Sequence, residues 1–300
     1  AVTGSGAVYG ELPRTHSFRV TGSCRLPELP EVETVRRGLR PLEGATMERI
    51  IVRKCQLRRR VSVAALHNLA GGVVAPLGRR AKYLLIPMVN GGGMIIHLGM
   101  SGRLFMANPG DPLDPHDHLS WWLKQRGATI ELRFRDPRRF GSVTVLQQGD
   151  LRKHPLLANL GPEPLGNEFT ADYAFARSKR SRRPIKNALM DARFVVGIGN
   201  IYASEALWRA QINPKTAVCR ISRRRWGKLV WAVQDVLDRA VSDGGTTLND
   251  FFGASGDPGY FQTRLRAYGQ RGEPCHRCGS MIRRISQAGR ATYYCVSCQH

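Results

Sequence analysis

The spacing of four cysteines near the C-terminus constrains the fold of this chain more than any other feature. Two C-x-x-C pairs stand sixteen residues apart, the first being Cys275 with Cys278 and the second Cys295 with Cys298. Each pair places two thiolates on one tight turn, and four thiolates complete the shell of a structural zinc ion. The sequence therefore predicts one structural Zn²⁺ that folds a short hairpin and has no open position for catalysis.

The other cysteines and the charge balance limit the kind of protein. Cys24, Cys55 and Cys219 are scattered, which fits a reducing compartment better than a disulfide framework. The chain has 46 Lys and Arg against 23 Asp and Glu, a net charge of +23. Such an excess is typical of proteins that meet phosphates, although ribosomal and membrane-surface proteins share it. No apolar run is long enough to span a membrane and no secretory signal opens the chain, so we expect a cytoplasmic protein.

Hydrophobic patterns divide the 300 residues into a strand-rich part and a helical part. After Pro30, the apolar Val32, Val35 and Leu39 have helical spacing. Between residues 48 and 147 strands are expected, because Ile130, Leu132 and Phe134 alternate with charged residues, which indicates a β-sandwich. Residues 154–167 are rich in Pro and Gly and predict a linker.

A long amphipathic helix is expected beyond the linker. Ser222 is suited to its N-cap and Gly244-Gly245 to its end. One face is apolar at helical spacing and is formed by Trp226, Leu229, Val230, Val233, Val236, Leu237 and Val241.

The segment PELPEVE at residues 27–33 has a chemistry that depends on its position. A proline inside a chain has an amide nitrogen, which is not a nucleophile. A proline at the start of a chain is a secondary amine, which can attack an electrophilic carbon. Twenty-six residues precede Pro27 here. Taken as a pattern alone, the segment would be a solvated turn.

The motifs together resemble the formamidopyrimidine-DNA glycosylases, which excise oxidised purines from DNA. The resemblance covers residues 27–300 in the order of the family, through PELPEVETVRRGL, RRAKYLL, IIHLGMSG, DPRRFG, LGPEPL, VVGIGNIYASE, GGTTL and the cysteine module. It implies an α+β multidomain fold: an N-terminal β-sandwich with a short helix, then a helical helix-two-turn-helix domain with a four-cysteine zinc ribbon. It also implies excision of 8-oxoguanine and formamidopyrimidines, followed by strand cleavage through β,δ-elimination.

The resemblance implies four catalytic residues. The Pro27 nitrogen is expected to attack C1′ of the damaged nucleotide and form a Schiff base, and Glu28 to transfer protons at the sugar. Lys82, in RRAKYLL, is expected to donate a proton and bind phosphate. Arg290, in the hairpin between the cysteine pairs, is expected to act in the second elimination, although an arginine there would otherwise be a phosphate contact.

The resemblance also implies DNA contacts. Met100, Arg138 and Phe140 match the residues that fill the space left by the extruded nucleotide, since the reaction requires the base to leave the stack. Without the resemblance, Met100 and Phe140 would be interpreted as core residues. His116 matches a DNA-contacting histidine. Asn200 should open a helix whose free N–H groups hold a phosphate.

A basic run at residues 177–186 adds candidate phosphate contacts. We expect them among Arg180, Arg182 and Lys186, because few acids balance the run. Ser181 stands where the family often has a lysine, so the individual assignments stay open. The lesion loop is expected within residues 251–263, whose composition is flexible and aromatic.

These inferences give a domain plan with damaged double-stranded DNA as partner. We expect an extension at 1–26, the catalytic sandwich at 27–153, a linker at 154–167, the helical domain at 168–265 and the zinc hairpin at 266–300. We expect a monomer in the bacterial cytoplasm and nucleoid, without a nucleotide cofactor. The extension is expected to be disordered or absent from the mature protein, with Pro27 exposed after removal of an initiator at position 26.

Two alternatives stay open. The endonuclease VIII branch shares the architecture but prefers oxidised pyrimidines, and its start usually departs from PELPEVE after the first Pro-Glu pair. A non-catalytic binder of damaged DNA would result if Pro27 stayed within a peptide bond.

Overall fold

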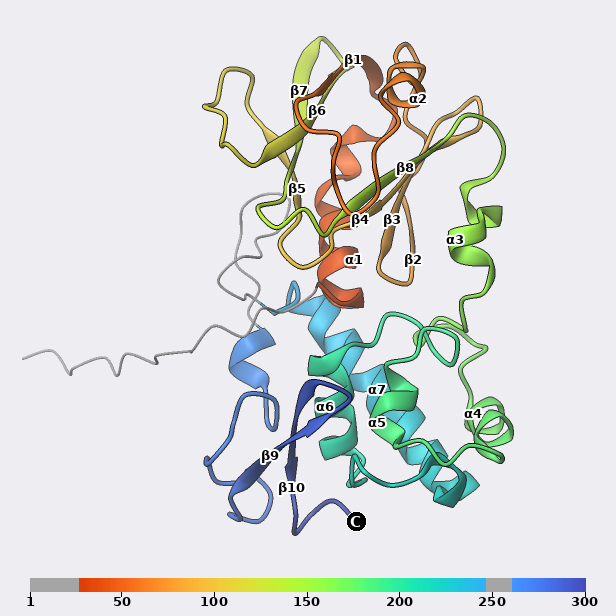
Figure 1. Cartoon of the computed structure of the whole chain (residues 1–300), viewed down its shortest axis with the longest axis vertical. Helices are drawn as coiled ribbons and strands as arrows, with labels where there is room; N and C mark the ends of the chain where they lie inside the picture. The colour runs from red at the N-terminus through yellow and green to blue at the C-terminus, as the bar shows by residue number, and fades with distance from the viewer. Residues whose placement is uncertain (1–26, 247–260) are drawn as a thin grey trace, which may run out of the picture.

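The computed structural model describes residues 27–246 and 261–300, which form two stacked halves (Figure 1). The upper half is a β-sandwich, and the lower half is helical and carries a two-stranded hairpin. The predicted α+β fold class is confirmed. The expected extension, residues 1–26, and residues 251–260 of the expected lesion loop lie outside the described residues.

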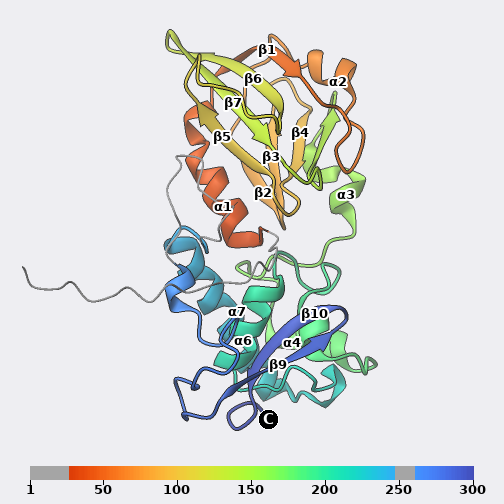
Figure 2. The same cartoon turned by 60° about the vertical axis from the view of Figure 1, so that its left-hand side comes forward.

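Helix α1 (Leu29–Gly38) opens the described chain and connects the two halves (Figures 1 and 2). Pro30 lies in its first turn, where a missing N–H costs nothing, and Arg36 and Arg37 lie in its last turn at the negative end of the dipole. Val32 and Val35 are buried, as the spacing predicted. A 3₁₀ turn, η1 (Arg40–Leu42), then leads into the sandwich.

The sandwich consists of two four-stranded antiparallel sheets. The first has the order β1 (Thr46–Val52), β6 (Asp117–Gln125), β7 (Ala128–Arg135) and β5 (Arg103–Ala107). The second has the order β2 (Gly78–Arg80), β3 (Tyr83–Pro87), β4 (Gly93–His97) and β8 (Ser142–Leu146). The short helix α2 (Val63–His67) lies beside β1 and β8.

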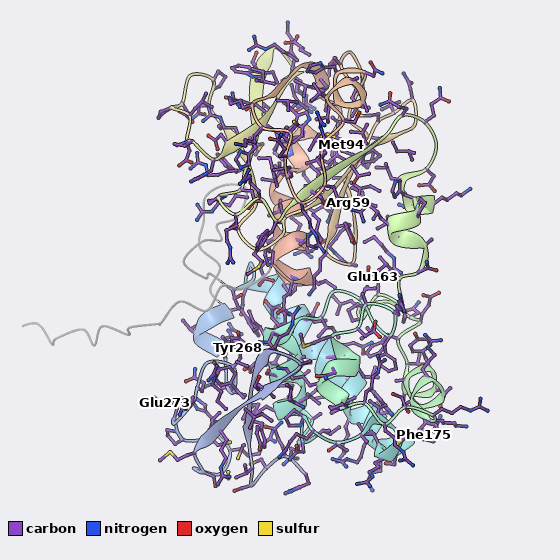
Figure 3. The ribbon with its side chains drawn as sticks, in the orientation of Figure 1. Arg59, Met94, Glu163, Phe175, Tyr268 and Glu273 are labelled. Carbon is purple, nitrogen blue, oxygen red and sulfur yellow. The ribbon has the colours of Figure 1, made fainter. Side chains whose placement is uncertain are left out.

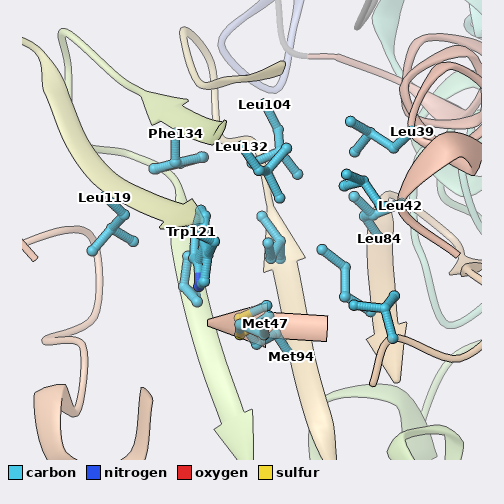
Figure 4. Close-up of a cluster of buried hydrophobic side chains, with 14 of the residues drawn as sticks. Leu39, Leu42, Met47, Leu84, Met94, Leu104, Leu119, Trp121, Leu132 and Phe134 are labelled. Atoms are coloured by element: carbon cyan, nitrogen blue, oxygen red, sulfur yellow. The ribbon is translucent and has the colours of Figure 1, made fainter. Parts of the chain in front are cut away.

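The sandwich core lies between the sheets and is closed by α1 and η1. Met47 and Met94 meet at its centre, with Trp121 on one side and Leu84 on the other (Figure 4). The predicted alternation along β7 holds for the apolar residues but not for the charged ones. Glu131 and Arg133 are also buried, and their side chains form an ion pair of 2.7 Å that compensates their desolvation.

The lower half is built from short helices around α7 (Arg223–Ser242). The seven apolar residues predicted for one face of α7 are all buried, and the Ser222 side chain accepts a hydrogen bond from the Arg225 backbone as an N-cap. The other elements of this half are α4 (Ala171–Ser178), α5 (Ile185–Leu189), α6 (Asn200–Arg209), η3 (Val218–Arg220) and η4 (Phe261–Arg264). Before them in the chain, η2 (Leu151–Lys153) and α3 (Pro155–Ala158) pack against β3 and β4 of the sandwich.

The C-terminal hairpin pairs β9 (Ile282–Gln287) with β10 (Arg290–Cys295) and packs against α6 (Figure 2). Its own core is small and includes Trp208, Ala267 and Ile282. Within the described ranges, no helix is long and apolar enough to cross a membrane.

Glu163 joins the connecting segment to the sandwich, and it lies where the two halves meet (Figure 3). Its carboxylate binds the guanidinium groups of Arg79 and Arg80 at 2.8 and 3.0 Å and accepts from the Ala81 backbone at 2.7 Å. Ala81 has a positive φ of 56°. These bonds fix the turn that carries Lys82.

Candidate active site at the domain junction

The N-terminus of α1 meets the N-terminus of α6 through the Glu28 carboxylate. That carboxylate accepts hydrogen bonds from the backbone N–H groups of Gly199 at 2.6 Å, Ile201 at 2.9 Å and Tyr202 at 3.4 Å. These donors belong to the start of α6, where N–H groups have no partner within the helix and the dipole favours an anion. A Cβ atom at position 199 would lie 2.3 Å from the Glu28 carboxyl carbon, so this contact requires glycine.

Glu31 forms a second buried carboxylate one turn along α1. It accepts from the Glu28 backbone N–H at 2.9 Å, from the Tyr202 hydroxyl at 2.6 Å, and from both the backbone and the hydroxyl of Thr246 at 2.9 Å. Burial, together with the neighbouring Glu31 and Glu28, raises the pKa of Tyr202 well above its usual range, which keeps the hydroxyl a donor. The sequence reasoning missed Glu31, although PELPEVE contains it. The two carboxylates fix Pro27 at the junction, where Pro27 is buried.

Lys82 reaches the same junction from the turn between β2 and β3. Its ammonium group donates to the Ile198 carbonyl at 3.3 Å. Burial lowers the pKa of Lys82, whereas Glu28 and Glu31 act to raise it. Burial also raises the pKa of Glu28, with Lys82 opposing the shift. Each group is thus moved toward its neutral form, a condition that favours proton transfer near neutral pH.

Lys186 attaches the hairpin to this junction. Its Nζ donates to the Asn200 side chain at 2.5 Å, the Ala291 carbonyl at 2.9 Å and the Thr292 hydroxyl at 2.7 Å. Burial lowers the pKa of Lys186 to about 7, Glu28 acts to raise it, and Arg290 lowers it further. Arg290 also lowers the pKa of Lys82, so the exposed first residue of β10 lies within electrostatic reach of both lysines.

The position of Lys186 changes the expectation for the basic run. Lys186 is 1% exposed, so it is not a surface residue like its neighbours. Arg180 and Arg182 are exposed on the segment before α5. We therefore keep the proposal of a surface phosphate contact for these two arginines and not for Lys186.

Asn200 opens α6 as predicted, but the N–H groups at the start of this helix already have an acceptor. Glu28 of the same chain already accepts from Gly199, Ile201 and Tyr202, as described above. The Asn200 side chain is occupied as well, since it accepts from Lys186 and donates to the Tyr268 hydroxyl at 3.5 Å. The N–H groups at the helix start thus hold an internal carboxylate, and a phosphate contact by Asn200 stays a prediction.

The loops that carry Met100, Arg138 and Phe140 lie together on the sandwich. Asp136 links them, because its carboxylate accepts from the Ser101 hydroxyl at 2.6 Å and from the Gly141 backbone at 2.7 Å. The Arg138 guanidinium lies 5.0 Å from the centre of the Phe140 ring, which is 43% exposed. Met100 is half-buried. The sequence reasoning missed Asp136, the first residue of DPRRFG.

Gly99 allows these two loops to touch. Its φ is +67°, and a Cβ atom would lie 2.4 Å from the Phe140 carbonyl carbon. His97 lies just before it, and its Nδ1 accepts from the Gly99 backbone at 3.0 Å. Burial lowers the pKa of His97 to about 4, with help from Lys82 and Arg58, so the ring is a neutral acceptor.

His116 lies at the sandwich surface near these loops. It is exposed, and its backbone donates to Asp114 at 2.8 Å. Its ring centre is 6.3 Å from that of His118, which is buried and bonded to the Asp136 carbonyl at 2.8 Å. His118 therefore supports the structure, whereas His116 is available to a ligand.

The four cysteines predicted to bind zinc converge at the base of the hairpin. Their Sγ atoms all lie within 4.8 Å of one another, and three of the four residues are buried. Zinc–sulfur bonds of about 2.3 Å in a tetrahedron separate the sulfurs by nearly 4 Å, so one ion fits. The Trp208 indole donates to Cys275 Sγ at 3.3 Å, a contact that stabilises the thiolate. The four cysteines form a site for one structural zinc ion.

The fold and the site together define a class of protein. A buried proline, carboxylates and a lysine meet between two domains, and a zinc-dependent hairpin brings an arginine beside them. This arrangement is that of an enzyme with its active site between two domains, and the net charge of +23 suits a polyanionic substrate.

Comparisons with known proteins specify the class. Residues 26–143 match the formamidopyrimidine-DNA glycosylase N-terminal domain, residues 160–251 its H2TH domain, and residues 272–300 the zinc finger found in FPG and IleRS. The formamidopyrimidine-DNA glycosylase of Thioalkalivibrio sulfidiphilus is 46% identical over 275 residues, 91% of this chain and 100% of the relative. That of Xanthomonas oryzae pv. oryzae is 47% identical over 276 residues, again 91% and 100%.

Solved structures of Fpg (MutM) proteins have the same fold as this chain. The crystal structure of the MutM (Fpg) protein from Thermus thermophilus is 40% identical, with a TM-score of 0.80 over 91% of this chain and 98% of that one. The Lactococcus lactis Fpg (MutM) complex with N7-benzyl-Fapy-dG containing DNA is 32% identical, with a TM-score of 0.83 over 91% and 99%. The chain belongs to the formamidopyrimidine-DNA glycosylase family and is a DNA glycosylase of base-excision repair.

Proposed function

We propose that this protein removes oxidised purines, 8-oxoguanine and formamidopyrimidines, from double-stranded DNA and then cleaves the strand as an AP lyase. The observation that carries the proposal is the junction itself. Pro27 is buried beside Glu28, whose carboxylate is fixed by α6, and Lys82 and Arg290 approach from two other elements.

Pro27 serves as the nucleophile once its nitrogen is a free amine. An α-amino group has a pKa near 8, so a useful fraction is unprotonated at neutral pH. The family match begins at residue 26, and 275 residues of this chain cover 100% of a relative. Both observations support a mature chain that begins at Pro27. Mass spectrometry of protein expressed from the native gene tests this start.

The reaction proceeds through one covalent intermediate. The Pro27 nitrogen forms a bond to C1′ while the bond from C1′ to the base breaks, and the base leaves with the electron pair and takes up a proton. The proline nitrogen loses its own proton, which frees its lone pair. Glu28 then delivers a proton to the sugar ring oxygen, the ring opens, and an iminium remains on the proline. The raised pKa of Glu28 suits this transfer.

The iminium makes strand cleavage possible because it acidifies the C2′ hydrogen. Loss of that proton expels the 3′ phosphate, and a second elimination expels the 5′ phosphate. Lys82 and Arg290 are assigned proton donation and phosphate binding in these steps, since both are cationic side chains at the junction. Water then releases the proline amine.

DNA is proposed to lie across the junction. Met100, Arg138 and Phe140 occupy the space of the extruded nucleotide, where an apolar wedge and a guanidinium offset part of the unstacking cost of a few kcal/mol. His116, Arg180 and Arg182 contact the backbone. The Lactococcus lactis relatives solved with Fapy-dG containing and abasic-site containing DNA support this partner.

Two assays test the proposal on protein whose N-terminus is verified as Pro27. Excision is compared on duplexes that carry 8-oxoguanine or thymine glycol, and sodium borohydride is added to reduce the Schiff base. We expect faster removal of 8-oxoguanine, a β,δ-elimination product and a covalent adduct. Absence of an adduct would indicate a non-catalytic binder of damaged DNA.

Oxidised pyrimidines are a second candidate substrate. The Lactococcus lactis Fpg (MutM) has been solved with an oxidized pyrimidine containing DNA, and it is 32% identical to this chain. Preferential removal of thymine glycol in the comparison above would establish this specificity and overturn the purine assignment.

A further inference from the structure

One tryptophan of this chain is placed unlike the others. All five lie within the described residues; Trp121 and Trp226 are 0% exposed, Trp208 is 8% exposed and Trp122 is half-buried, whereas Trp231 is 56% exposed. Trp231 lies in the middle of α7, on the face opposite the buried stripe. Large aromatic side chains on a surface are typical of contact points between proteins.

The Trp231 ring is held in a fixed orientation. The Arg209 guanidinium, at the end of α6, lies 4.8 Å from its ring centre. Arg209 is held in turn by Asp235 at 2.7 Å, and Asp235 also binds Arg239 at 2.9 Å. A ring fixed in this way loses little conformational entropy when a partner covers it.

A basic cavity lies one turn before Trp231. Its volume is about 340 Å³, and its lining includes Arg224, Arg225 and Lys228. Arg225 donates to the backbone oxygen of His300. Arg224 and Lys228 are exposed, and neither makes an ion pair with any residue that the structure describes. Lys228 stands three residues before Trp231, so the cavity and the ring are adjacent on the helix.

The combination favours an acidic peptide over the other possible occupants. A duplex presents phosphates on both sides of a contact, and the exposed Asp238, two turns beyond Trp231 on α7, would repel them. Stacked bases also offer no surface to an exposed indole. A second copy of this chain would bring a net charge of +23 to a basic face. These arguments do not apply to a short peptide segment that places acidic residues in the cavity and one apolar residue on the ring.

The surface is remote from the proposed active site. Helix α6 has ten residues and spans about 15 Å, with Asn200 at the junction and Arg209 beneath Trp231. A partner bound there would leave the junction free to act on DNA.

We propose that the outer face of α7, formed by Arg224, Lys228 and Trp231, docks an acidic peptide segment of a partner protein, with its acids in the cavity and an apolar residue on the indole. Arg224 and Trp231 are seven residues apart, about 10 Å along the helix, a span of roughly three extended residues. The segment thus has its apolar residue about three positions from its acids.

The test uses a fluorescein-labelled peptide of three acidic residues, a Ser-Gly spacer and a phenylalanine, titrated with the full chain and followed by anisotropy. We expect saturable binding that Trp231→Ala weakens at least 10-fold and that the double variant Arg224→Glu with Lys228→Glu weakens at least 30-fold. The matched control, Arg152→Glu with Lys153→Glu on the exposed face of η2, should bind the peptide normally. Thermal unfolding checks that each variant is folded.

A coupling measurement locates the apolar residue. Replacing the phenylalanine of the peptide by serine should weaken binding to the wild-type chain about 10-fold but hardly affect Trp231→Ala, since the partner is already lost. If the peptide change and Trp231→Ala weakened binding independently, so that their losses added, the proposed contact would be wrong. It would also be wrong if the substitutions at Arg224, Lys228 and Trp231 left peptide binding unchanged. Loss of duplex affinity in the double variant without loss of peptide binding would assign the surface to DNA instead. Failure of excision chemistry would leave these outcomes unchanged.

Discussion

The zinc hairpin and the domain junction are both small, polar centres, but they are held together in opposite ways. The hairpin has four thiolates within 24 positions of sequence and a core of few side chains, so a metal ion supplies its stability. The junction uses carboxylates and backbone N–H groups that stand 171 to 215 positions apart. Ligands close in sequence can hold a metal ion even where the hydrophobic core is small. Hydrogen-bonding groups that are distant in sequence meet only if the helices that carry them pack closely.

Loss of the metal is expected to have the largest effect. Structural zinc contributes on the order of 10 kcal/mol to a site of this type, so the Cys298→Ser variant or chelation should unfold the hairpin and remove Arg290. We expect strand cleavage to be abolished while the sandwich stays folded. Zinc content and cleavage of 8-oxoguanine duplex provide the readouts. Cys219→Ser, at an exposed cysteine outside the cluster, is the control, and an active zinc-free enzyme would contradict the prediction.

A single methyl group should disrupt the junction. In Gly199→Ala the new Cβ would lie 2.3 Å from the Glu28 carboxyl carbon, so α1 and α6 must separate. We expect excision to fall about 100-fold and stability by about 1–3 kcal/mol, measured by urea unfolding. Gly227→Ala in α7 is the matched control, because the nearest atom to its new Cβ is 4.0 Å away. If the two variants had equal excision rates and equal stability, close packing of Glu28 against Gly199 would not be required.

The hydrogen bond from Trp208 to the cysteine cluster should have a smaller effect. Trp208→Phe removes this bond to Cys275 Sγ but keeps an aromatic ring in the core. We expect zinc affinity to fall about 10-fold, measured by competition with a chelator. Trp231→Phe, the control, changes the same residue type at an exposed position without a thiolate contact. An unchanged affinity in Trp208→Phe would show that the indole only packs.

Lys186, where the two centres touch, should make the stability of the fold depend on pH. Its pKa is about 7 in the fold against about 10.4 in an unfolded chain, so between these values the unfolded state holds the extra proton. Stability therefore rises with pH across this window, by at most about 1.4 kcal/mol per pH unit, and is flat below pH 7 for this group. The slope should disappear in Lys186→Met. A slope retained in that variant would assign it to other groups.

Local patterns predicted the parts of the structure that local chemistry determines. The four cysteines, the buried stripe of α7 and the Ser222 cap each depend on residues close in sequence, and their positions are as predicted. The partners of Glu28 could not be predicted, because nothing in PELPE indicates that three backbone N–H groups of α6 will receive its carboxylate. Lys186 was misplaced for the same reason, since a lysine within a basic run is usually exposed.

The claim on which the mechanism depends is tested by comparing two forms of the chain, one that begins at Pro27 and one that retains residues 1–26. Both are incubated with 8-oxoguanine duplex and borohydride, and the adduct is mapped by mass spectrometry after duplex affinity is shown to be equal. The account predicts an adduct on the Pro27 amine of the shorter form and none on the longer one. An adduct at Lys82 or elsewhere, or full cleavage by a form verified to keep its leader, would contradict it.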